Sequence, residues 1–247
     1  MSVKTILVSQ PKPSSEKSPY FDLAQKYKLK IDFVPFINVV GVTAREFRAQ
    51  KIDLGLHSAV ILTSKTSVDN FFRIAEETRY KVPESMKYFC ISEAIAYYLQ
   101  KYVVYRKRKI FFGKQNINDL VDILKKHKDE RYLLPCSDIL RQNIPDTLVA
   151  NNVNYTKAVL YRTVAADLSD LEDVKYDLLV FFSPSGIESL LKNFPDFKQN
   201  KTMIAAFGPT TANAVKKNNL RLDIHAPQPK NPSMTMAIES YIKGAKK

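Results

Sequence analysis

Short apolar runs alternate with longer segments of helical period along the whole chain, and this alternation most constrains the fold. The apolar runs are rich in β-branched and aromatic residues and predict strands within residues 5–8, 31–34, 59–63, 88–91, 110–112, 132–134, 178–182 and 203–207. Apolar residues three or four positions apart predict helices within residues 21–27, 68–75, 95–99, 117–124, 139–149, 187–191 and 212–215. Because the strand runs are almost continuously apolar, both faces of each sheet should be covered. The pattern therefore predicts an α/β fold with parallel sheets.

Two segments break this alternation. Residues 35–40, PFINVV, form a second extended run directly after a predicted strand, and residues 156–164, TKAVLYRTV, are long, β-prone and more polar. We interpret both as connecting strands rather than core strands. If they pair with each other, they would form a two-stranded hinge between domains.

The chain also repeats part of its own pattern. Residues 59–72, AVILTSKTSVDNFF, resemble residues 178–191, LLVFFSPSGIESLL, and Thr63 and Ser183 end the matching runs at a separation of 183 − 63 = 120 residues. The next strand and helix repeat as well, KYFCISEAIAYYL against TMIAAFGPTTANAV. Two related α/β domains would explain both pairs.

The net charge limits the class of partner. Lys and Arg number 38 and Asp and Glu 25, which gives +13 at neutral pH. Such an excess favours a polyanionic partner: nucleic acid, an anionic membrane, or a small ligand with several carboxylates or phosphates. The alternative is a basic surface kept for solubility.

The cysteines and apolar runs bear on the compartment. Cys90 and Cys136 lie in separate apolar stretches, so a disulfide framework is not supported and a reducing cytosol is expected. No apolar run approaches the ~20 residues that a membrane helix needs. The first residues, MSVKTILVSQPKP, do not resemble a signal peptide and predict a core strand instead. We therefore expect a cytoplasmic protein.

Hydroxyl-rich turns follow several predicted strands and open the next helix. They are SPSG at 183–186, GPTT at 208–211, TSKTS at 63–67 and the turn at Ser92. A helix N-terminus offers unpaired backbone N–H groups and a partial positive charge, so these turns are plausible anion cradles. Ordinary helix capping is the alternative for each turn taken singly. At the carboxyl ends of parallel strands, all four would face the same cleft.

Common catalytic signatures are missing from the sequence. It contains no GxGxxG or GxxxxGK[ST] phosphate loop, no HExxH or CxxC pair and no GxSxG turn, and its three histidines, His57, His127 and His225, are far apart. We expect no metal and no cofactor. The basic run at 106–109, RKRK, could contact phosphate or carboxylate, although a solvated strand end explains it as well.

Several motifs in order resemble one family along essentially the whole chain. They are ILVSQP, ILTSKTSV, LLPCSDILRQNIPDTL, VLYRTV, LVFFSPSGIESLL, AAFGPTTANAV and HAPQPKNPSMTMAI. Together they resemble the uroporphyrinogen-III synthase family. The resemblance implies two flavodoxin-like α/β domains with parallel sheets, joined by a two-stranded β-ladder. Residues 1–35 plus 168–247 would form a discontinuous first domain, 43–157 an inserted second domain, and 36–42 and 158–167 the ladder.

The resemblance also implies an activity. The family's substrate is hydroxymethylbilane, a linear tetrapyrrole with several carboxylates. The enzyme removes its hydroxyl as water, inverts the last pyrrole ring through a spiro intermediate and closes the macrocycle. This is cofactor-free lyase chemistry in tetrapyrrole (haem) biosynthesis. It depends mainly on orientation, with a weak acid near the leaving hydroxyl, and it fits a basic protein with anion-binding turns.

Family roles carry over to particular residues. Tyr161 in VLYRT matches the tyrosine thought to assist departure of the hydroxyl, whereas a ladder tyrosine with a solvated hydroxyl is the alternative. Arg141 could pair with a carboxylate or support its own turn. The substrate-binding candidates are Ser9, Gln10, Ser64, Lys65, Ser92, Arg141, Ser183, Pro184, Ser185, Gly186, Thr210 and Thr211.

The sequence departs from the family pattern at one turn in each of the two predicted domains. Gln10 stands where many members place an arginine, and Ser92 stands where the family often has a glycine, with Ile95 near its usual threonine. Glu93 would add a negative charge beside an anion site. We therefore favour the turns of the first domain over those of the inserted one as substrate-binding sites, and the chain could be a diverged member with weakened activity.

Three functions remain open from the sequence. The first is the cyclising enzyme, a monomer whose partner is a linear tetrapyrrole and which binds neither nucleic acid nor membrane. The second is a non-catalytic two-domain module that binds or senses a polycarboxylate or tetrapyrrole, which the altered turn at Ser92 would favour. The third is a basic nucleic-acid binder, whose affinity would fall steeply with salt.

Overall fold

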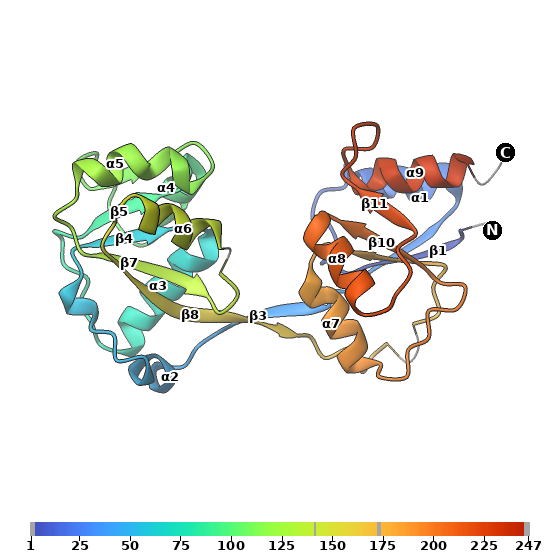
Figure 1. Cartoon of the computed structure of the whole chain (residues 1–247), viewed down its shortest axis with the longest axis horizontal. Coiled ribbons are helices and arrows are strands. Elements are labelled where there is room, and N and C mark those ends of the chain that lie inside the picture. Colours follow the sequence, from blue (N-terminus) through green and yellow to red (C-terminus); the bar gives the residue numbers. More distant parts are fainter. Residues whose placement is uncertain (1–2, 141, 172–173, 245–247) are drawn as a thin grey trace. The chain divides into compact units, whose positions relative to one another are not determined.

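Parallel sheets organise the chain in two separate units. The computed structural model describes residues 3–140, 142–171 and 174–244. One unit comprises Met1–Asn38 with Val164–Lys247, and the other comprises Val39–Thr163. Figure 1 shows helices on the faces of a sheet in each unit. The chain is therefore an α/β protein with parallel-rich sheets, as the apolar pattern predicts.

The first unit contains a five-stranded sheet in the order β11-β10-β9-β1-β2, and every neighbouring pair is parallel. The strands are β1 (Thr5–Val8), β2 (Lys30–Phe33), β9 (Leu178–Phe181), β10 (Met203–Phe207) and β11 (Ile224–Ala226). The helices are α1 (Pro19–Tyr27), α7 (Pro184–Asn193), α8 (Pro209–Lys217) and α9 (Met234–Gly244).

Alternate residues of β1 enter different cores of this unit. Ile6 and Val8 pack with Leu23 of α1 and Ile238 of α9. Leu7 lies between them in sequence and packs instead with the cluster formed by α7 and α8. Since strand side chains alternate between faces, α1 and α9 cover one face and α7 and α8 the other. The continuous apolar run in β1 is explained by this double cover.

The second unit contains a six-stranded sheet in the order β3-β8-β7-β4-β5-β6. The strands are β3 (Ile37–Gly41), β4 (Ala59–Leu62), β5 (Lys87–Cys90), β6 (Ile110–Phe112), β7 (Tyr132–Ser137) and β8 (Tyr155–Ala165). The helices are α2 (Ala44–Ala49), α3 (Lys65–Glu77), α4 (Glu93–Leu99), α5 (Val121–Lys126) and α6 (Asn143–Ala150), with 3-10 turns η1 (Leu54–Leu56) and η2 (Ile117–Leu120). All pairs from β8 to β6 are parallel.

The two sheets share one strand order. Counted from β1, the first sheet reads 2-1-3-4-5 as β2-β1-β9-β10-β11. Counted from β7, the second reads 2-1-3-4-5 as β8-β7-β4-β5-β6, with β3 added at its edge. The repeated sequences therefore occupy equivalent places, β4 and α3 matching β9 and α7, and β5 and α4 matching β10 and α8. In the second unit, the strands equivalent to β1 and β2 come last along the chain.

The chain passes from one unit to the other within β3 and β8, which are neighbours in the sheet. The N–H of Val42 donates to the carbonyl of Leu160, and the N–H of Ala166 donates to the carbonyl of Phe36. The first segment runs from Phe36 to Val42, while its partners run backwards from Ala166 to Leu160. The two segments are therefore antiparallel.

Two sequence predictions need correction, and some elements were missed. Residues 156–159 are not merely connecting, because they pair in parallel with β7 in the core sheet. The helix predicted within 139–149 begins only at Asn143, since a turn at Asp138 holds the N–H of Ile139 at 3.0 Å from its carboxylate. The strand β11 and the helices α2 and α9 were not predicted. β11 has only three residues, too few for a periodicity to be recognised.

Candidate active site

Each sheet has a point at which the chain leaves two adjacent strands in opposite directions. In the first unit these strands are β1 and β9, and in the second they are β7 and β4. In open α/β sheets, ligands bind beyond the carboxyl ends of the strands at such a point. Most of the sequence-predicted site residues follow one of these strands or the next strand along.

In the first unit, the turns after β1 and β9 lie against each other. The N–H of Ser9 donates to the carbonyl of Val180 at 3.0 Å. A Cβ placed on Gly186 would lie 3.6 Å from the Oγ of Ser183, 3.7 Å from the Oγ of Ser9 and 3.3 Å from the ring of Phe181. The structure thus brings Ser9, Ser183 and Gly186 together. A larger side chain at Gly186 would crowd this group.

The SPSG turn serves partly as a helix cap. Ser183 is the N-cap of α7, and its Oγ accepts from the N–H of Gly186 at 3.2 Å. Pro184 occupies the first helical position, where a missing N–H costs nothing. Among the described residues, the N–H of Ser185 has no protein acceptor. Ser185, rather than Gly186, therefore offers the free backbone donor expected of an anion cradle.

The second turn of this unit begins α8. Gly208 has φ 84°, a left-handed conformation that favours glycine, and Pro209 opens the helix. Thr210 is exposed, but Thr211 is only 1% exposed. Thr210 can therefore meet a ligand with its hydroxyl, whereas the Thr211 side chain belongs to the core. Gln10, in the loop after β1, is exposed.

In the second unit, Ser64 and Tyr161 form a hydroxyl pair. The Oγ of Ser64 lies 3.4 Å from the hydroxyl of Tyr161, which is 9% exposed. Ser64 is the N-cap of α3, and its Oγ also accepts from the N–H of Ser67 at 3.0 Å. Ser67 in turn accepts from the N–H groups of Thr63 and Ser64 at 3.1 and 3.0 Å. This reciprocal cap holds the Ser64 hydroxyl in place beside Tyr161.

Burial controls the acidity of Tyr161. It raises the pKa of the phenol above its ordinary value, and the hydrogen bond with Ser64 only partly opposes this effect. Tyr161 consequently remains protonated through neutral pH. A protonated, nearly buried phenol can donate a hydrogen bond to a leaving oxygen.

Other predicted residues of the second unit are less enclosed. Lys65 is exposed, with its Nζ 5.3 Å from the centroid of the Tyr98 ring. Ser92 is the N-cap of α4 but makes no side-chain cap bond, and Glu93 follows in the first turn as an exposed carboxylate. Arg141 lies outside the described residues.

Asp138 is a further polar group at the carboxyl end of β7 that sequence reasoning missed. Burial acts to raise the pKa of its carboxyl, but donors on Ser137, Thr163 and Ile139 outweigh burial and hold the pKa below its usual value. Its own N–H donates to the carbonyl of Tyr161 at 3.1 Å. A carboxylate four residues after the strand predicted at 132–134 was the available signal for Asp138.

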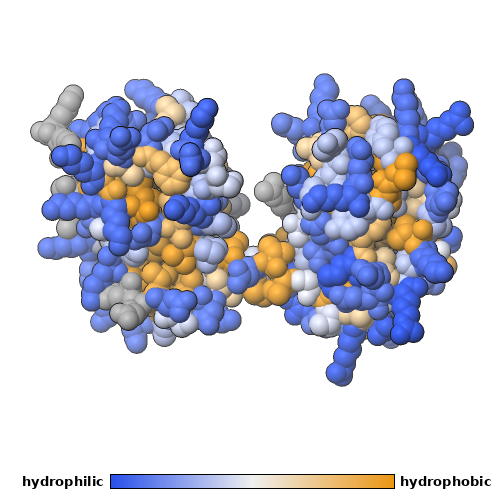
Figure 2. All heavy atoms as spheres, turned by 180° about the vertical axis from the view of Figure 1, so that it is seen from behind, coloured by the Kyte–Doolittle hydropathy of each residue, from blue (hydrophilic) through white to orange (hydrophobic). Residues whose placement is uncertain are grey.

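Other features of the described residues lie apart from these turns. A cavity of about 350 Å³ between Phe72, Tyr88 and Tyr102 contains none of the predicted site residues. Cys90 and Cys136 are buried free thiols, and burial raises their pKa values to about 12 and about 11. Within residues 3–140, 142–171 and 174–244 no cluster of metal-binding side chains and no helix able to span a membrane is found. Hydrophilic side chains cover much of the face seen in Figure 2.

Comparison with known proteins identifies the family. A family model described as uroporphyrinogen-III synthase HemD matches residues 19–236. The chain belongs to this family. The family match includes Ser64, Tyr161, the SPSG turn and Thr210, and it ends within α9.

Relatives within the uroporphyrinogen-III synthase family are distant in sequence. The uroporphyrinogen-III synthase of Saccharomyces cerevisiae is 27% identical over 139 residues, about half of each protein: 51% of this chain and 50% of the yeast protein. The uroporphyrinogen-III synthase of Chlorobaculum parvum is 23% identical over 257 residues, and the alignment covers 98% of this chain and 100% of the Chlorobaculum protein. The crystal structure of uroporphyrinogen-III synthetase from Helicobacter pylori aligns with a TM-score of 0.61 at 17% identity and covers 97% of this chain and 99% of that one. At this identity the structural likeness shows the fold.

Proposed function

We propose that this protein is a uroporphyrinogen-III synthase, which dehydrates and cyclises hydroxymethylbilane with inversion of the last pyrrole ring. The family match carries the reaction class. The pairing of the buried Tyr161 hydroxyl with Ser64 carries the proposed site. The reaction belongs to tetrapyrrole, and hence haem, biosynthesis.

The chemistry requires little more than orientation and one weak acid. Electrons of the pyrrole that carries the hydroxymethyl group expel the hydroxyl. The C–O bond breaks, and a proton donor converts the departing oxygen to water. The substituted carbon of the last ring attacks the resulting cation to form the spiro intermediate. That ring then detaches and rejoins in the inverted orientation, and loss of a proton completes the macrocycle. Holding reactants in the productive geometry can supply several kcal/mol of the barrier, about 7–11 in the best cases.

Tyr161 is the residue proposed to assist the first step. Its raised pKa keeps the phenol protonated, so the hydroxyl can donate to the leaving oxygen while Ser64 orients it. A positioned acid of this kind contributes roughly a hundredfold or more to rate. Because the phenol is a poor acid, it stabilises the departing oxygen chiefly through a hydrogen bond.

Carboxylates of the substrate are proposed to bind the helix-opening turns of each unit. In the first unit the donors are the backbone at Ser185 and the hydroxyls of Ser9 and Thr210. In the second, they are the first-turn N–H groups of α3 and the ammonium of Lys65. The exposed Glu93 makes the α4 turn the weakest of the set.

The architecture proposed for this function has two flavodoxin-like domains joined by a β-ladder. Residues 1–35 with 168–247 and residues 43–157 would be the domains, and 36–42 with 158–167 the ladder. The shared 2-1-3-4-5 order, which is that of flavodoxin, supports the domain type, and the adjacency of β3 and β8 supports the ladder. We expect the protein to act as a cytoplasmic monomer, which sedimentation analysis and cell fractionation would test.

A coupled assay tests the activity. Hydroxymethylbilane generated in situ cyclises spontaneously to the type I isomer, so the uroporphyrins formed with and without the protein are separated by chromatography. We expect type III to dominate when the protein is present. If only the type I isomer forms, the enzymatic function is refuted. The remaining alternative is then the non-catalytic binding or sensor module, which the Ser92–Glu93 turn favours. Calorimetric titration with a stable linear tetrapyrrole would then detect that module.

A further inference from the structure

The strand that carries Tyr161 contains an irregularity directly before that residue. Along β7 and β8, Cys136 pairs with Val159, but the next residue, Ser137, pairs with Tyr161. Leu160 is therefore an extra residue without a partner on β7. Such a bulge changes the direction of the following side chain and is frequent beside active sites.

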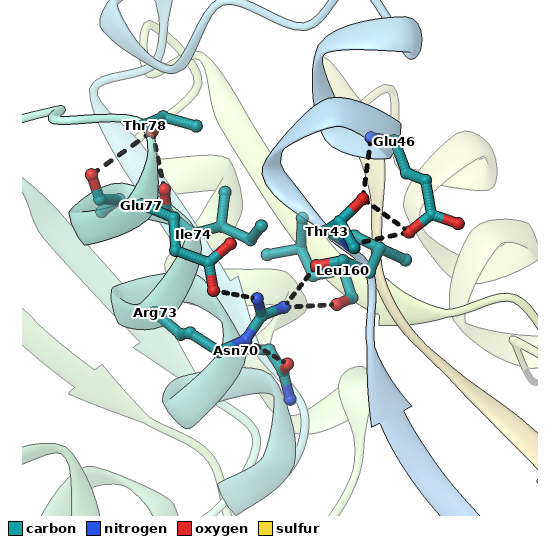
Figure 3. A network of polar contacts seen from close by, with 10 residues as sticks. Thr43, Glu46, Asn70, Arg73, Ile74, Glu77, Thr78 and Leu160 are labelled. Atoms are coloured by element: carbon teal, nitrogen blue, oxygen red, sulfur yellow. Dashed lines mark hydrogen bonds and ion pairs between the residues drawn. The ribbon is translucent and has the colours of Figure 1, made fainter.

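Arg73 of α3 holds the backbone at this bulge (Figure 3). Its Nη2 donates to the carbonyl of Leu160 at 3.2 Å and to the carbonyl of Val42 at 2.9 Å. Its Nη1 pairs with Glu77 at 2.6 Å, and its Nε donates to Asn70 at 3.1 Å. All three guanidinium nitrogens are thus engaged, and the planar group links α3 to β8 and to Val42, the residue directly after β3.

Gly41 on β3 provides a second observation for the same contact. A Cβ at this position would lie 2.5 Å from Nη2 and 2.6 Å from Cζ of Arg73. The guanidinium can therefore approach the strands only because residue 41 has no side chain. The glycine requirement here comes from close approach, since Gly41 is not among the residues with positive φ.

Arg73 and Ser64 belong to the same helical segment, one within α3 and one at its N-cap. The segment contacts β8 twice: Arg73 binds the carbonyl before Tyr161, and Ser64 lies beside the Tyr161 hydroxyl. We propose that Arg73 is a positioning residue that fixes the bulge at Leu160 and thereby aims the Tyr161 hydroxyl at the reacting substrate. This inference rests on the proposed function, because it assigns Arg73 to the same reaction.

Kinetics of Arg73→Met test the proposal. We expect kcat to fall about tenfold with KM changed less than threefold, and the type III fraction to fall, because the hydroxyl becomes misplaced while the anion-binding turns remain. Arg73→Lys should be intermediate, since an ammonium group cannot reach both carbonyls and both side-chain acceptors together.

Arg221 offers a matched control in the other unit. It also binds two carbonyls, those of Asn200 and Thr202, and a carboxylate, that of Asp223. Arg221→Met removes a comparable set of bonds without touching β8, and should leave kcat within twofold. Equal losses of kcat in the two variants would reduce Arg73 to a structural role and overturn the proposal.

A measurement without substrate separates the two levels of inference. Among the 13 tyrosines, the NMR signal of Tyr161 in protein labelled at tyrosine Cζ is identified by its absence in Tyr161→Phe. Arg73→Met should move this signal and its titration, and Arg221→Met should not. An unchanged signal in Arg73→Met overturns the positioning role even if the enzyme is active. If the wild-type protein yields only type I uroporphyrin, the proposed function fails, while the signal still decides whether Arg73 places Tyr161.

Discussion

The turns after β9 and β4 occupy the same place in their two sheets but present different chemistry. After β9, Ser183 caps α7, and a compact group with Ser9 and Gly186 leaves the backbone donor of Ser185 free. After β4, Ser64 caps α3 and meets the buried hydroxyl of Tyr161. The turn after β9 is suited only to hold an anion, whereas the turn after β4 also orients an acid.

The difference arises from the strand two places away in each sheet, β2 from β9 and β8 from β4. In the first sheet, β2 has four residues and lies at the edge. Its equivalent, β8, has eleven residues, is covered by β3 and carries the bulge before Tyr161. Repeated strand–helix units can therefore acquire separate roles through a longer strand elsewhere in the same sheet, with little change in the turns themselves. This comparison predicts that changes after β9 affect mainly KM and changes around β4 and β8 affect mainly kcat.

The largest effect should come from Tyr161→Phe. Removing the hydroxyl eliminates the proposed hydrogen-bond donor to the leaving oxygen but keeps the buried ring, so kcat should fall about a hundredfold while the fold is retained. The coupled assay measures the rate, and circular dichroism and thermal unfolding check the fold. Unchanged turnover would remove Tyr161 from the mechanism.

Gly186→Val should have the next largest effect. A side chain here would press on Ser9, Ser183 and Phe181, so we expect KM to rise about tenfold with kcat within threefold. Gly244 at the end of α9 is the matched control, because a Cβ there would have nothing within 4 Å. A fall in kcat at constant KM would contradict the assignment of this turn to binding.

Ser64→Ala should have a smaller and mixed effect. Loss of the cap should lower the free energy of unfolding by about 1 kcal/mol, and loss of the contact with Tyr161 should lower kcat severalfold. Asn116→Ala removes another capping box in the same unit, away from Tyr161, and should reduce stability alone. Denaturant unfolding and the coupled assay separate the two effects. Equal kcat values for the two variants would show that Ser64 acts only as a cap.

The pH dependence of Tyr161 should show the smallest effect. Burial raises its pKa, so the phenol stays protonated below the ordinary value of about 10, and activity should fall only as pH rises through the higher folded value. The stability linked to Tyr161 is likewise fully present below the pKa of the unfolded chain, and it is lost as pH rises through the higher pKa of the folded protein. The Ser64 bond lowers the folded pKa, so Ser64→Ala should shift the Tyr161 titration to higher pH. Difference absorbance at the tyrosinate band against Tyr161→Phe measures this, and a downward shift would contradict it.

The part of the site that could be predicted lies in the turns. Ser64 and Ser183 follow apolar runs directly, so strand ends and helix caps are readable from local order. Thr211 shows the limit of this reasoning, since its position after GP predicts a ligand contact, yet its side chain is buried. Asp138 and Arg73 were missed because their partners, Thr163 and Leu160, are 25 and 87 residues away.

Local features of the sequence predict the α/β class, the paired strand–helix units and the family, because apolar periodicity, capping residues and short motifs are local. Contacts between distant segments, seen in the folded chain, show that residues 156–159 join the core sheet, that β8 has an extra residue at Leu160, and that Arg73 requires Gly41. Register and close approach depend on which distant segments pack together. No local pattern encodes that information, since the same residues could meet several neighbours.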